Sequence, residues 1–197
     1  MSLAVLNRQV VVIAVAIGLT LIITPRLLVW ARRSAAPQKL APYVQTPQDV
    51  VERMLQIAQV GRNDVVYDLG CGDGRLVITA ARKYGARGVG VDFDLNRVKE
   101  SQANAEKAGV AALVAFRQQD ALTVDVSPAT VVTLYLLTSS NLKLRPILTK
   151  ALRPGARIVS HQFGMGDWRP ETQETLTEAD GSLHILYLWK ADGQVRP

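Results

Sequence analysis

Residues 65–77 read Val-Val-Tyr-Asp-Leu-Gly-Cys-Gly-Asp-Gly-Arg-Leu-Val, and this stretch decides the fold. Its β-branched and aromatic beginning is typical of a buried strand, which Asp68 closes. Glycines follow at alternate positions: Gly70, Gly72 and Gly74. The apolar periodicity of residues 76–84 then predicts a helix. A strand, a glycine turn and a helix N-terminus bring backbone N–H groups and the positive end of a helix dipole to one point, which predicts a site for a nucleotide-like ligand.

The spacing of the glycines selects among such ligands. The dinucleotide fingerprint G-x-G-x-x-G would require glycine or alanine at position 75, where the chain has Arg75. The pattern Asp68-x-Gly70-x-Gly72-x-Gly74 resembles instead the first motif of the seven-strand S-adenosylmethionine-dependent methyltransferases. The resemblance implies that Asp68 and the glycines bind this cofactor, whose ammonium group suits a carboxylate. A plain tight connection is the alternative.

Two further acids support a cofactor site. Asp92 ends a short strand pattern over residues 88–92, about 20 residues after the glycine turn, where an acid can accept hydrogen bonds from both ribose hydroxyls. Capping of the next helix is the alternative role for Asp92, although Asp94 is better placed for it. Asp120, within Phe-Arg-Gln-Gln-Asp-Ala, resembles the acid of the family's third strand, which implies contact with the adenine amino edge.

The positive charge of the chain lies at its N-terminus. The chain has 23 basic and 17 acidic residues, a net charge of +6. The basic residues that precede the first acid, Asp49, are Arg8, Arg26, Arg32, Arg33 and Lys39. Without these five, 18 basic and 17 acidic residues remain, a net charge of +1. A surface that tracks nucleic-acid phosphates is therefore not expected, and 48% apolar residues in 197 suit one α/β core.

An uncharged apolar run covers residues 10–24 and is interrupted by Pro25 and Arg26. The run spans only about 22 Å as a helix, less than the ~30 Å hydrocarbon core of a bilayer. If the Arg26 side chain snorkels to the interface, the segment can extend to Trp30, a residue type typical of interfacial depth. We therefore expect residues 1–33 to form a transmembrane anchor. A cleaved signal peptide and a buried core helix are the alternatives.

The charges around this run predict its orientation. The basic residues after the run are Arg26, Arg32, Arg33 and Lys39, and Arg8 precedes it. The positive-inside rule then predicts a single-pass membrane protein with the following domain on the cytoplasmic side. In a eukaryotic chain the acid-free start would also resemble a transit peptide, and a mitochondrial membrane would be expected. Residues 34–41 are expected to be a linker, and residues 42–197 the methyltransferase domain.

Residues 42–47, Pro-Tyr-Val-Gln-Thr-Pro, stand before the first core strand. Thr46 predicts a helix N-cap, Pro47 suits the first helical position, and Asp49 completes an acidic capping box. The helix is expected to run to about Val60. Methyltransferases of the resembled kind place a flap over the methyl group at this point of the chain.

The remaining patterns alternate between strand and helix. Residues 130–137 predict a strand buried on both faces. Residues 138–140 can cap a helix within residues 141–152, and Pro146 inside that span favours a regular helix that begins only there. Residues 156–160 predict another strand, and Asp180-Gly181 predicts the turn of a closing hairpin. The chain is therefore expected to be α/β, a doubly wound, mostly parallel seven-stranded sheet of the Rossmann-like methyltransferase fold, whose last strand runs antiparallel.

A narrower resemblance rests on three segments: residues 42–47, residues 67–75, and Leu-Tyr-Leu-Leu at 134–137. They are similar to the membrane-associated lysine methyltransferases, which include mitochondrial enzymes acting on the ATP synthase c-subunit and the adenine nucleotide translocase. Archaeal and bacterial relatives belong to the same group, and bacterial members carry a segment like residues 160–168. The resemblance covers about residues 40–191.

The resemblance implies S-adenosyl-L-methionine as cofactor and a protein lysine, for instance of a membrane protein, as methyl acceptor. The transfer is an in-line displacement dominated by positioning, and a lysine of pKa ~10.4 must first lose its proton. Tyr43, Thr46 and Tyr135 would line the acceptor pocket and orient the amine, with a core aromatic as the alternative for Tyr135. His161 is either a base or a satisfied residue at a strand end, and Trp168 either a substrate wall or packing.

Two other functions stay open. One is a small-molecule or lipid methyltransferase that uses the anchor to reach a quinone or isoprenoid. The other is a non-catalytic S-adenosylmethionine-binding module, which the complete motif from Asp68 to Gly74 disfavours. We expect neither nucleic acid nor a metal ion as a partner.

Overall fold

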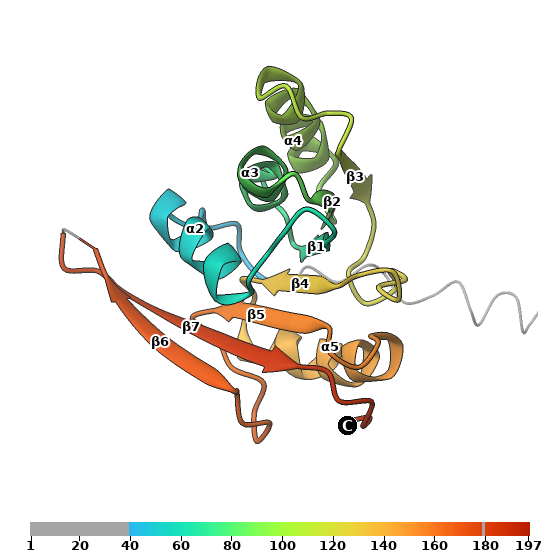
Figure 1. The fold of residues 1–197 in the computed structure, drawn as a ribbon, viewed down its shortest axis with the longest axis vertical. Coiled ribbons are helices and arrows are strands. Elements are labelled where there is room, and N and C mark those ends of the chain that lie inside the picture. The colour runs from blue at the N-terminus through green and yellow to red at the C-terminus, as the bar shows by residue number, and fades with distance from the viewer. Residues whose placement is uncertain (1–39, 179) are drawn as a thin grey trace, which may run out of the picture. The chain divides into compact units, whose positions relative to one another are not determined.

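The computed structural model describes residues 40–178 and 180–197, which form one seven-stranded sheet with helices on both faces (Figure 1). The helices of these residues are α2 (Gln48–Ile57), α3 (Arg75–Tyr84), α4 (Leu95–Lys107) and α5 (Thr138–Ala151). The strands are β1 (Val65–Leu69), β2 (Arg87–Asp92), β3 (Val114–Gln118), β4 (Val131–Leu134), β5 (Arg157–His161), β6 (Thr172–Thr177) and β7 (Leu183–Lys190).

The strands lie side by side in the order β3-β2-β1-β4-β5-β7-β6. From β3 to β5 all neighbouring strands are parallel, whereas β7 runs antiparallel to both β5 and β6. The reversal follows from the short β6–β7 turn, because strands joined by a tight hairpin pair in opposite directions. The predicted doubly wound, mostly parallel sheet with an antiparallel last strand is confirmed.

Apolar clusters join the helices to each face of the sheet. The cluster on one face contains Leu55 of α2 and Val66 of β1, and the cluster on the other face contains Leu144 of α5. Tyr67 and Leu69 of β1 belong to the second cluster, so successive side chains of β1 point to opposite faces. Burial on both faces explains why the central strands are almost entirely apolar.

The parallel strands end together at one edge, here called the carboxyl edge, which contains Leu69, Asp92, Leu134 and His161. They begin together at the opposite edge, called the amino edge, near Val65. The strand order reverses at β1, which lies between β2 and β4. Open α/β sheets bind ligands outside the carboxyl ends of the strands at such a reversal, and the glycine turn follows β1 there.

The predicted start and end of α2 are wrong. Pro47, and not Thr46, is the N-cap residue of α2, and no side chain caps the helix. The helix ends at Ile57 instead of near Val60, because Gln59 adopts a positive φ of 51°, which breaks the helical path. The Thr46 side chain is therefore free of the capping role that the sequence predicted.

The predicted start of α5 is also wrong. The helix begins at Thr138 and continues through Pro146. Proline inside a helix removes a hydrogen bond and costs about 3 kcal/mol. Leu144 and Leu148 are fully buried against the sheet, and burying such side chains stabilises by about 1.5–3 kcal/mol each, which offsets that cost.

Among residues 40–178 and 180–197 no helix has both the length and the apolar character needed to cross a bilayer. The anchor predicted for residues 1–33 and most of the predicted linker, residues 34–41, lie outside the described residues.

Candidate active site

The glycine turn joins β1 to α3 at the carboxyl edge. The N–H groups of Gly70 and Cys71 donate to the carbonyl of Val91 at 2.8 and 3.0 Å, which ties the turn to β2. Gly70, Gly72 and Gly74 have φ values of 88°, 54° and 80°. A side chain opposes this left-handed conformation, so glycine is needed at these positions.

The surroundings of two of the glycines differ. A Cβ atom on Gly72 would lie 2.4 Å from Cε2 of Tyr43. A Cβ atom on Gly74 would lie 2.6 Å from Cβ of Ser101 and 2.7 Å from Cε1 of Phe116. Gly74 therefore lets α3 pack closely on α4 and β3, whereas Gly72 faces the segment before α2.

Asp68 is a buried carboxyl group at the carboxyl edge. Its side chain accepts a hydrogen bond of 2.8 Å from Oγ1 of Thr133. Burial, with smaller contributions from the charges of Asp92 and Asp73, raises the pKa of Asp68 to about 7. A cation bound nearby would relieve both the burial cost and the repulsion, so this edge favours a positively charged ligand group.

Asp92 ends β2 beside the glycine turn. Its Oδ2 accepts a hydrogen bond of 2.9 Å from the N–H of Gly72, and its Oδ1 accepts one of 2.9 Å from the N–H of Asp94. Asp94 is the N-cap of α4 and accepts a hydrogen bond from the N–H of Asn96 at 2.8 Å. The capping role thus belongs to Asp94, and the Asp92 carboxylate is fixed against the glycine turn.

Asp120 follows β3 on the same edge. The N–H of Gln119 donates to the carbonyl of Asp92 at 3.0 Å, which places the segment beside the end of β2. The Asp120 carboxylate accepts a hydrogen bond of 2.9 Å from the N–H of Leu122. The acids predicted for the cofactor site therefore come from the ends of three neighbouring strands.

These groups fit S-adenosylmethionine. Asp73 pairs with Arg75 at 2.5 Å, whereas within residues 40–178 and 180–197 the Asp68 side chain has only the Thr133 hydroxyl as a hydrogen-bond donor. Asp68 would hold the ammonium group of the cofactor, and Asp92 its ribose hydroxyls. The same carboxylates would repel the pyrophosphate of a dinucleotide.

Residues 42–47, called the flap, contact the glycine turn. The Tyr43 ring lies against Gly72 and under the Arg97 guanidinium, whose centre is 4.1 Å from the ring centroid. Arg75 Nη1 donates to the carbonyl of Thr46 at 2.7 Å. The flap is therefore held at the carboxyl edge, with Tyr43 on the side of the predicted cofactor residues.

Thr46 and Tyr135 both contact His161 and form a second cluster, separate from the contacts of Tyr43 described above. Oγ1 of Thr46 lies 3.4 Å from Nδ1 of His161. The ring centroids of Tyr135 and His161 are 3.9 Å apart, with an interplanar angle of 33°. His161 is fully buried, and this burial, together with the charge of His184, lowers its pKa to about 4. His161 is therefore a neutral residue at the end of β5 with a polar neighbour at each ring nitrogen.

His184 was missed by the sequence analysis. Its Nδ1 lies 2.9 Å from Nε2 of His161, so the chain's two histidines are in contact. The register pairs His161 with Leu186, and the period of two places His184 on the same face of β7. That alternation could have indicated the pair, but only with the order of the strands in hand.

Trp168 has a packing role. Its carbonyl accepts a hydrogen bond of 2.8 Å from Nε1 of Trp189, and the two ring centroids lie 5.9 Å apart. Both residues belong to the apolar cluster on the α5 face, whereas Thr46 contacts His161, which lies on the α2 face. The substrate-wall interpretation of Trp168 is therefore not supported by its position.

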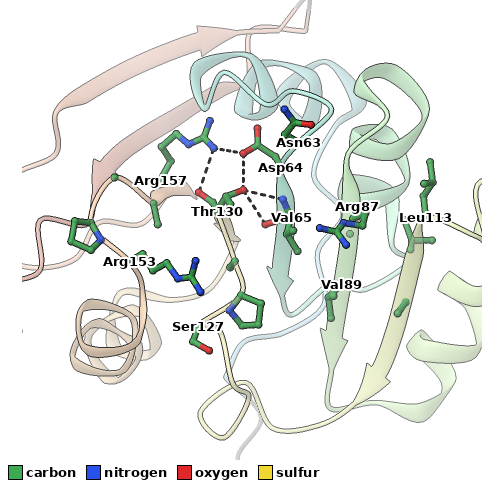
Figure 2. A pocket seen from close by; sticks show the side chains of 18 of the residues that line it. Asn63, Asp64, Val65, Arg87, Val89, Leu113, Ser127, Thr130, Arg153 and Arg157 are labelled. Atoms are coloured by element: carbon green, nitrogen blue, oxygen red, sulfur yellow. Dashed lines mark hydrogen bonds and ion pairs between the residues drawn. The ribbon is translucent and has the colours of Figure 1, made fainter.

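The amino edge carries a pocket of about 860 Å³ around the starts of the strands (Figure 2). Asp64 pairs there with Arg157 and accepts a hydrogen bond of 2.6 Å from Oγ1 of Thr130. None of the residues predicted for the cofactor or acceptor site lines this pocket. In the described part of the chain, no group of at least three histidine, cysteine, aspartate or glutamate side chains is arranged to hold a metal ion.

Comparison with known proteins decides the class. Residues 68–172 match the family described as the ANTKMT methyltransferase domain. The chain belongs to this family. A protein-lysine N-methyltransferase of Saccharolobus islandicus is 47% identical over 150 residues, which are 75% of this chain and 92% of that protein. The adenine nucleotide translocase lysine N-methyltransferase of Mus musculus is 33% identical over 130 residues, 66% of this chain but 56% of that enzyme.

A solved structure identifies the cofactor of the family fold. The crystal structure of a protein described as an RNA methyltransferase from Salinibacter ruber, in complex with S-adenosyl-L-homocysteine, is 52% identical. It aligns with a TM-score of 0.73 and covers 78% of this chain and 97% of that one. The chain described here, as a member of the same family, is therefore an S-adenosylmethionine-dependent methyltransferase with the Rossmann-like methyltransferase fold.

Proposed function

We propose that this methyltransferase transfers methyl groups to lysine side chains of a protein at or near a membrane. The observation that carries the acceptor class is the uncharged polar cluster of Thr46, Tyr135 and His161 at the carboxyl edge. A lysine amine attacks only as the neutral base, and a partly buried site without a fixed anion disfavours its ammonium form.

The chain's own residues would position the amine. Bound S-adenosylmethionine supplies an electrophilic methyl group on a positively charged sulfur. Thr46 offers a hydroxyl, and Tyr135 offers a hydroxyl and a ring face, to hold the lysine nitrogen in line with that group. His161 stays neutral because burial lowers its pKa to about 4, so it adds no positive charge that would oppose a cationic acceptor. Such positioning can contribute about 7–11 kcal/mol to lowering the barrier.

The relatives support lysine more than they support RNA. The Saccharolobus islandicus and Mus musculus relatives are named as lysine N-methyltransferases, and the Salinibacter ruber relative is described as an RNA methyltransferase. RNA binding depends on clustered basic residues that neutralise phosphates, whereas residues 40–197 carry 18 basic and 17 acidic residues. The near-neutral charge of the domain favours a protein acceptor.

The membrane part of the proposal rests on the apolar run of residues 10–24 and the basic residues that follow it. We expect the full chain to stay with membranes after a high-salt wash, because insertion into lipid is not screened by salt. The domain would then face the cytoplasm. Release of the full chain by salt would contradict this location and leave the methyl-transfer proposal untouched.

The acceptor can be tested directly. Full-length protein is incubated with methyl-labelled S-adenosylmethionine and a total membrane extract, and label is measured in the protein, organic-soluble and RNA fractions. We expect label in protein, recovered as N-methyl-lysine after hydrolysis, and its loss when lysines are chemically blocked beforehand. Label in the organic or RNA fraction would overturn the lysine proposal in favour of a lipid or RNA acceptor. Gly72→Ala, in which we expect cofactor binding to be strongly weakened, serves as the control.

A further inference from the structure

A row of polar side chains leads away from the flap toward the turn of the β6–β7 hairpin. Thr46 Oγ1 lies 3.4 Å from His161 Nδ1, and His161 Nε2 lies 2.9 Å from His184 Nδ1. His184 Nε2 then lies 3.4 Å from Oε1 of Glu178. These four residues, called the histidine row, connect β5 to β7 and to the end of β6.

The row is most buried in its middle. His161 is fully buried, whereas Thr46 at one end is partly exposed and the side chains of His184 and Glu178 are 16% and 21% exposed. The row therefore runs from the candidate acceptor site at Thr46 through a buried imidazole to a partly exposed carboxyl group. In Figure 1 the β6–β7 turn lies at the margin of the domain on the side of α2.

One set of tautomers aligns the donors from Thr46 to His184. The Thr46 hydroxyl can donate to Nδ1 of His161 while Nε2–H of His161 donates to Nδ1 of His184. Nε2 of His184 lies 3.4 Å from Oε1 of Glu178 without an aligned hydrogen bond between them. The last transfer therefore requires the Glu178 side chain to rotate toward Nε2 of His184.

Charged groups face the far end of the row from each element packed against it. Asp49 of α2 and Asp180 of the hairpin turn act on Glu178, and the Arg53–Glu174 ion pair joins α2 to β6. Burial, followed by the charge of Asp49, raises the pKa of the Glu178 carboxyl. Glu178 is therefore a better proton acceptor than an ordinary surface glutamate.

The histidine row contributes little to the stability of the fold. Glu178 Oε1 and His184 Nε2 are both buried, and neither makes a well-aligned hydrogen bond in the described residues. A buried polar atom without such a bond costs about 1–3 kcal/mol. A hydrophobic residue at position 184 would avoid that cost, so fold stability does not explain these side chains.

We propose that the histidine row transfers the proton of the acceptor lysine to Glu178 and from there to the solvent. This inference rests on the proposed lysine acceptor. The N–H bond of the ammonium breaks and its proton goes to the Thr46 oxygen, while the Thr46 proton goes to Nδ1 of His161. The Nε2 proton of His161 goes to Nδ1 of His184, and the Nε2 proton of His184 goes to Glu178, which releases it to water. The row is left with each imidazole hydrogen on the other ring nitrogen, and no net charge remains in the site.

The test compares two carboxylates that face α2 from the same hairpin. Glu178→Gln removes the end of the row, whereas Glu174→Gln removes the partner of Arg53 and leaves the row intact. Turnover of the full-length protein is measured from pH 7 to pH 10 with labelled cofactor and the membrane extract. Calorimetry measures cofactor affinity. His184→Leu is the second variant, and its thermal unfolding is recorded.

At pH 7 we expect Glu178→Gln and His184→Leu to slow turnover about 100-fold, a usual size for a lost proton-transfer group, with unchanged cofactor affinity. The loss should shrink toward pH 10, where the lysine arrives already deprotonated. Glu174→Gln should keep the wild-type profile. Wild-type turnover in Glu178→Gln at pH 7, or a loss of turnover that is the same at every pH, would overturn the proposal that the histidine row carries the proton. If the wild type itself does not methylate lysine, the acceptor proposal fails instead.

Discussion

Asp64 directly before β1 and Asp68 near its carboxyl end show how the two edges of the sheet differ. Both side chains are largely buried, 13% exposed for Asp64 and 7% for the whole of Asp68. Burial alone would raise the pKa of Asp64, but hydrogen bonds from Thr130, Gly61 and Arg157 lower it below the usual value. Burial raises the pKa of Asp68 to about 7, because only Thr133 opposes it.

The comparison separates stability from binding. At the amino edge the charge of Asp64 is neutralised within the fold by Arg157, so the pair locks β1, β4 and β5 together (Figure 2). At the carboxyl edge no cationic side chain of the described residues pairs with Asp68, so a cationic ligand group would supply the missing counter-charge. Similar burial therefore has opposite consequences, depending on whether the fold or the cofactor supplies the counter-charge.

The largest expected effect is a loss of cofactor affinity on replacing a glycine at the carboxyl edge, compared with a glycine at the amino edge. Gly72→Ala should weaken cofactor binding at least about 100-fold, because its Cβ would lie 2.4 Å from Tyr43 at a φ of 54°. Gly155→Ala at the amino edge is the matched control, since it has a φ of 88° but no atom within 4 Å of the added Cβ. Calorimetry should find normal cofactor affinity in Gly155→Ala. Equal affinities in the two variants would remove the glycine turn from the cofactor site.

Exchanging the two aspartates for asparagine should separate the two roles. Asp64→Asn should lower the free energy of unfolding by about 2 kcal/mol, because it leaves Arg157 without its partner, and should keep cofactor affinity. Asp68→Asn should weaken the cofactor complex at least about tenfold. Denaturant titration and calorimetry on both variants check this. If Asp68→Asn lost stability but kept its cofactor affinity, Asp68 would have a structural role like that of Asp64 and no role in binding.

The pH dependence of binding should sharpen the contrast. Since the folded pKa of Asp68 is about 7, above the usual value of 3.8, the free folded state binds more protons than the unfolded one between these pH values. Its stability therefore falls as pH rises toward 7. Cofactor affinity should rise over the same window, by at most about tenfold per pH unit, because the cation binds the ionised form. Asp68→Asn should flatten this rise, and a rise that persists in the variant would assign it to another group.

The smallest effect is expected at Tyr43. Tyr43→Phe keeps the ring on Gly72 and removes the hydroxyl that accepts a hydrogen bond of 3.1 Å from Gln45. Cofactor affinity should stay within about twofold, and a role of the hydroxyl in orienting the amine should lower kcat alone. Tyr43→Ala should also weaken the cofactor complex, by about threefold, through the lost ring contact. Unchanged kinetics in both variants would leave the flap without a part in the reaction.

The elements with strong local signals were predicted well. Asp94 caps α4 as the sequence predicted, because a cap acts within a few residues. The predicted glycine turn is likewise present, with left-handed angles at Gly70, Gly72 and Gly74. Thr46 failed as a cap, and α5 runs through Pro146, since tertiary contacts outweighed the local preference in both places.

The site was predicted in two unequal halves. Asp68, Asp92 and the glycines lie within one short stretch and its neighbouring strand, so their spacing alone indicated a cofactor site. Thr46, Tyr135 and His161 come from three distant segments and meet only when β4 and β5 pair beside the flap. His184 carried no signal of its own, because its partner depends on the register of β5 and β7.

The sequence by itself determined the α/β class and the glycine turn, because these depend on periodicity and on residues that are neighbours along the chain. The type of cofactor followed from the resemblance of that turn to the motif of a known family. The tertiary structure alone decided which charges are neutralised. The motif singled out Asp68 but gave no charge partner for either aspartate. Only the arrival of Arg157 from β5 beside Asp64 makes that residue a structural ion pair, whereas no cation of the described residues pairs with Asp68. Electrostatic energies depend on distances between groups that are far apart in the chain, and folding sets those distances.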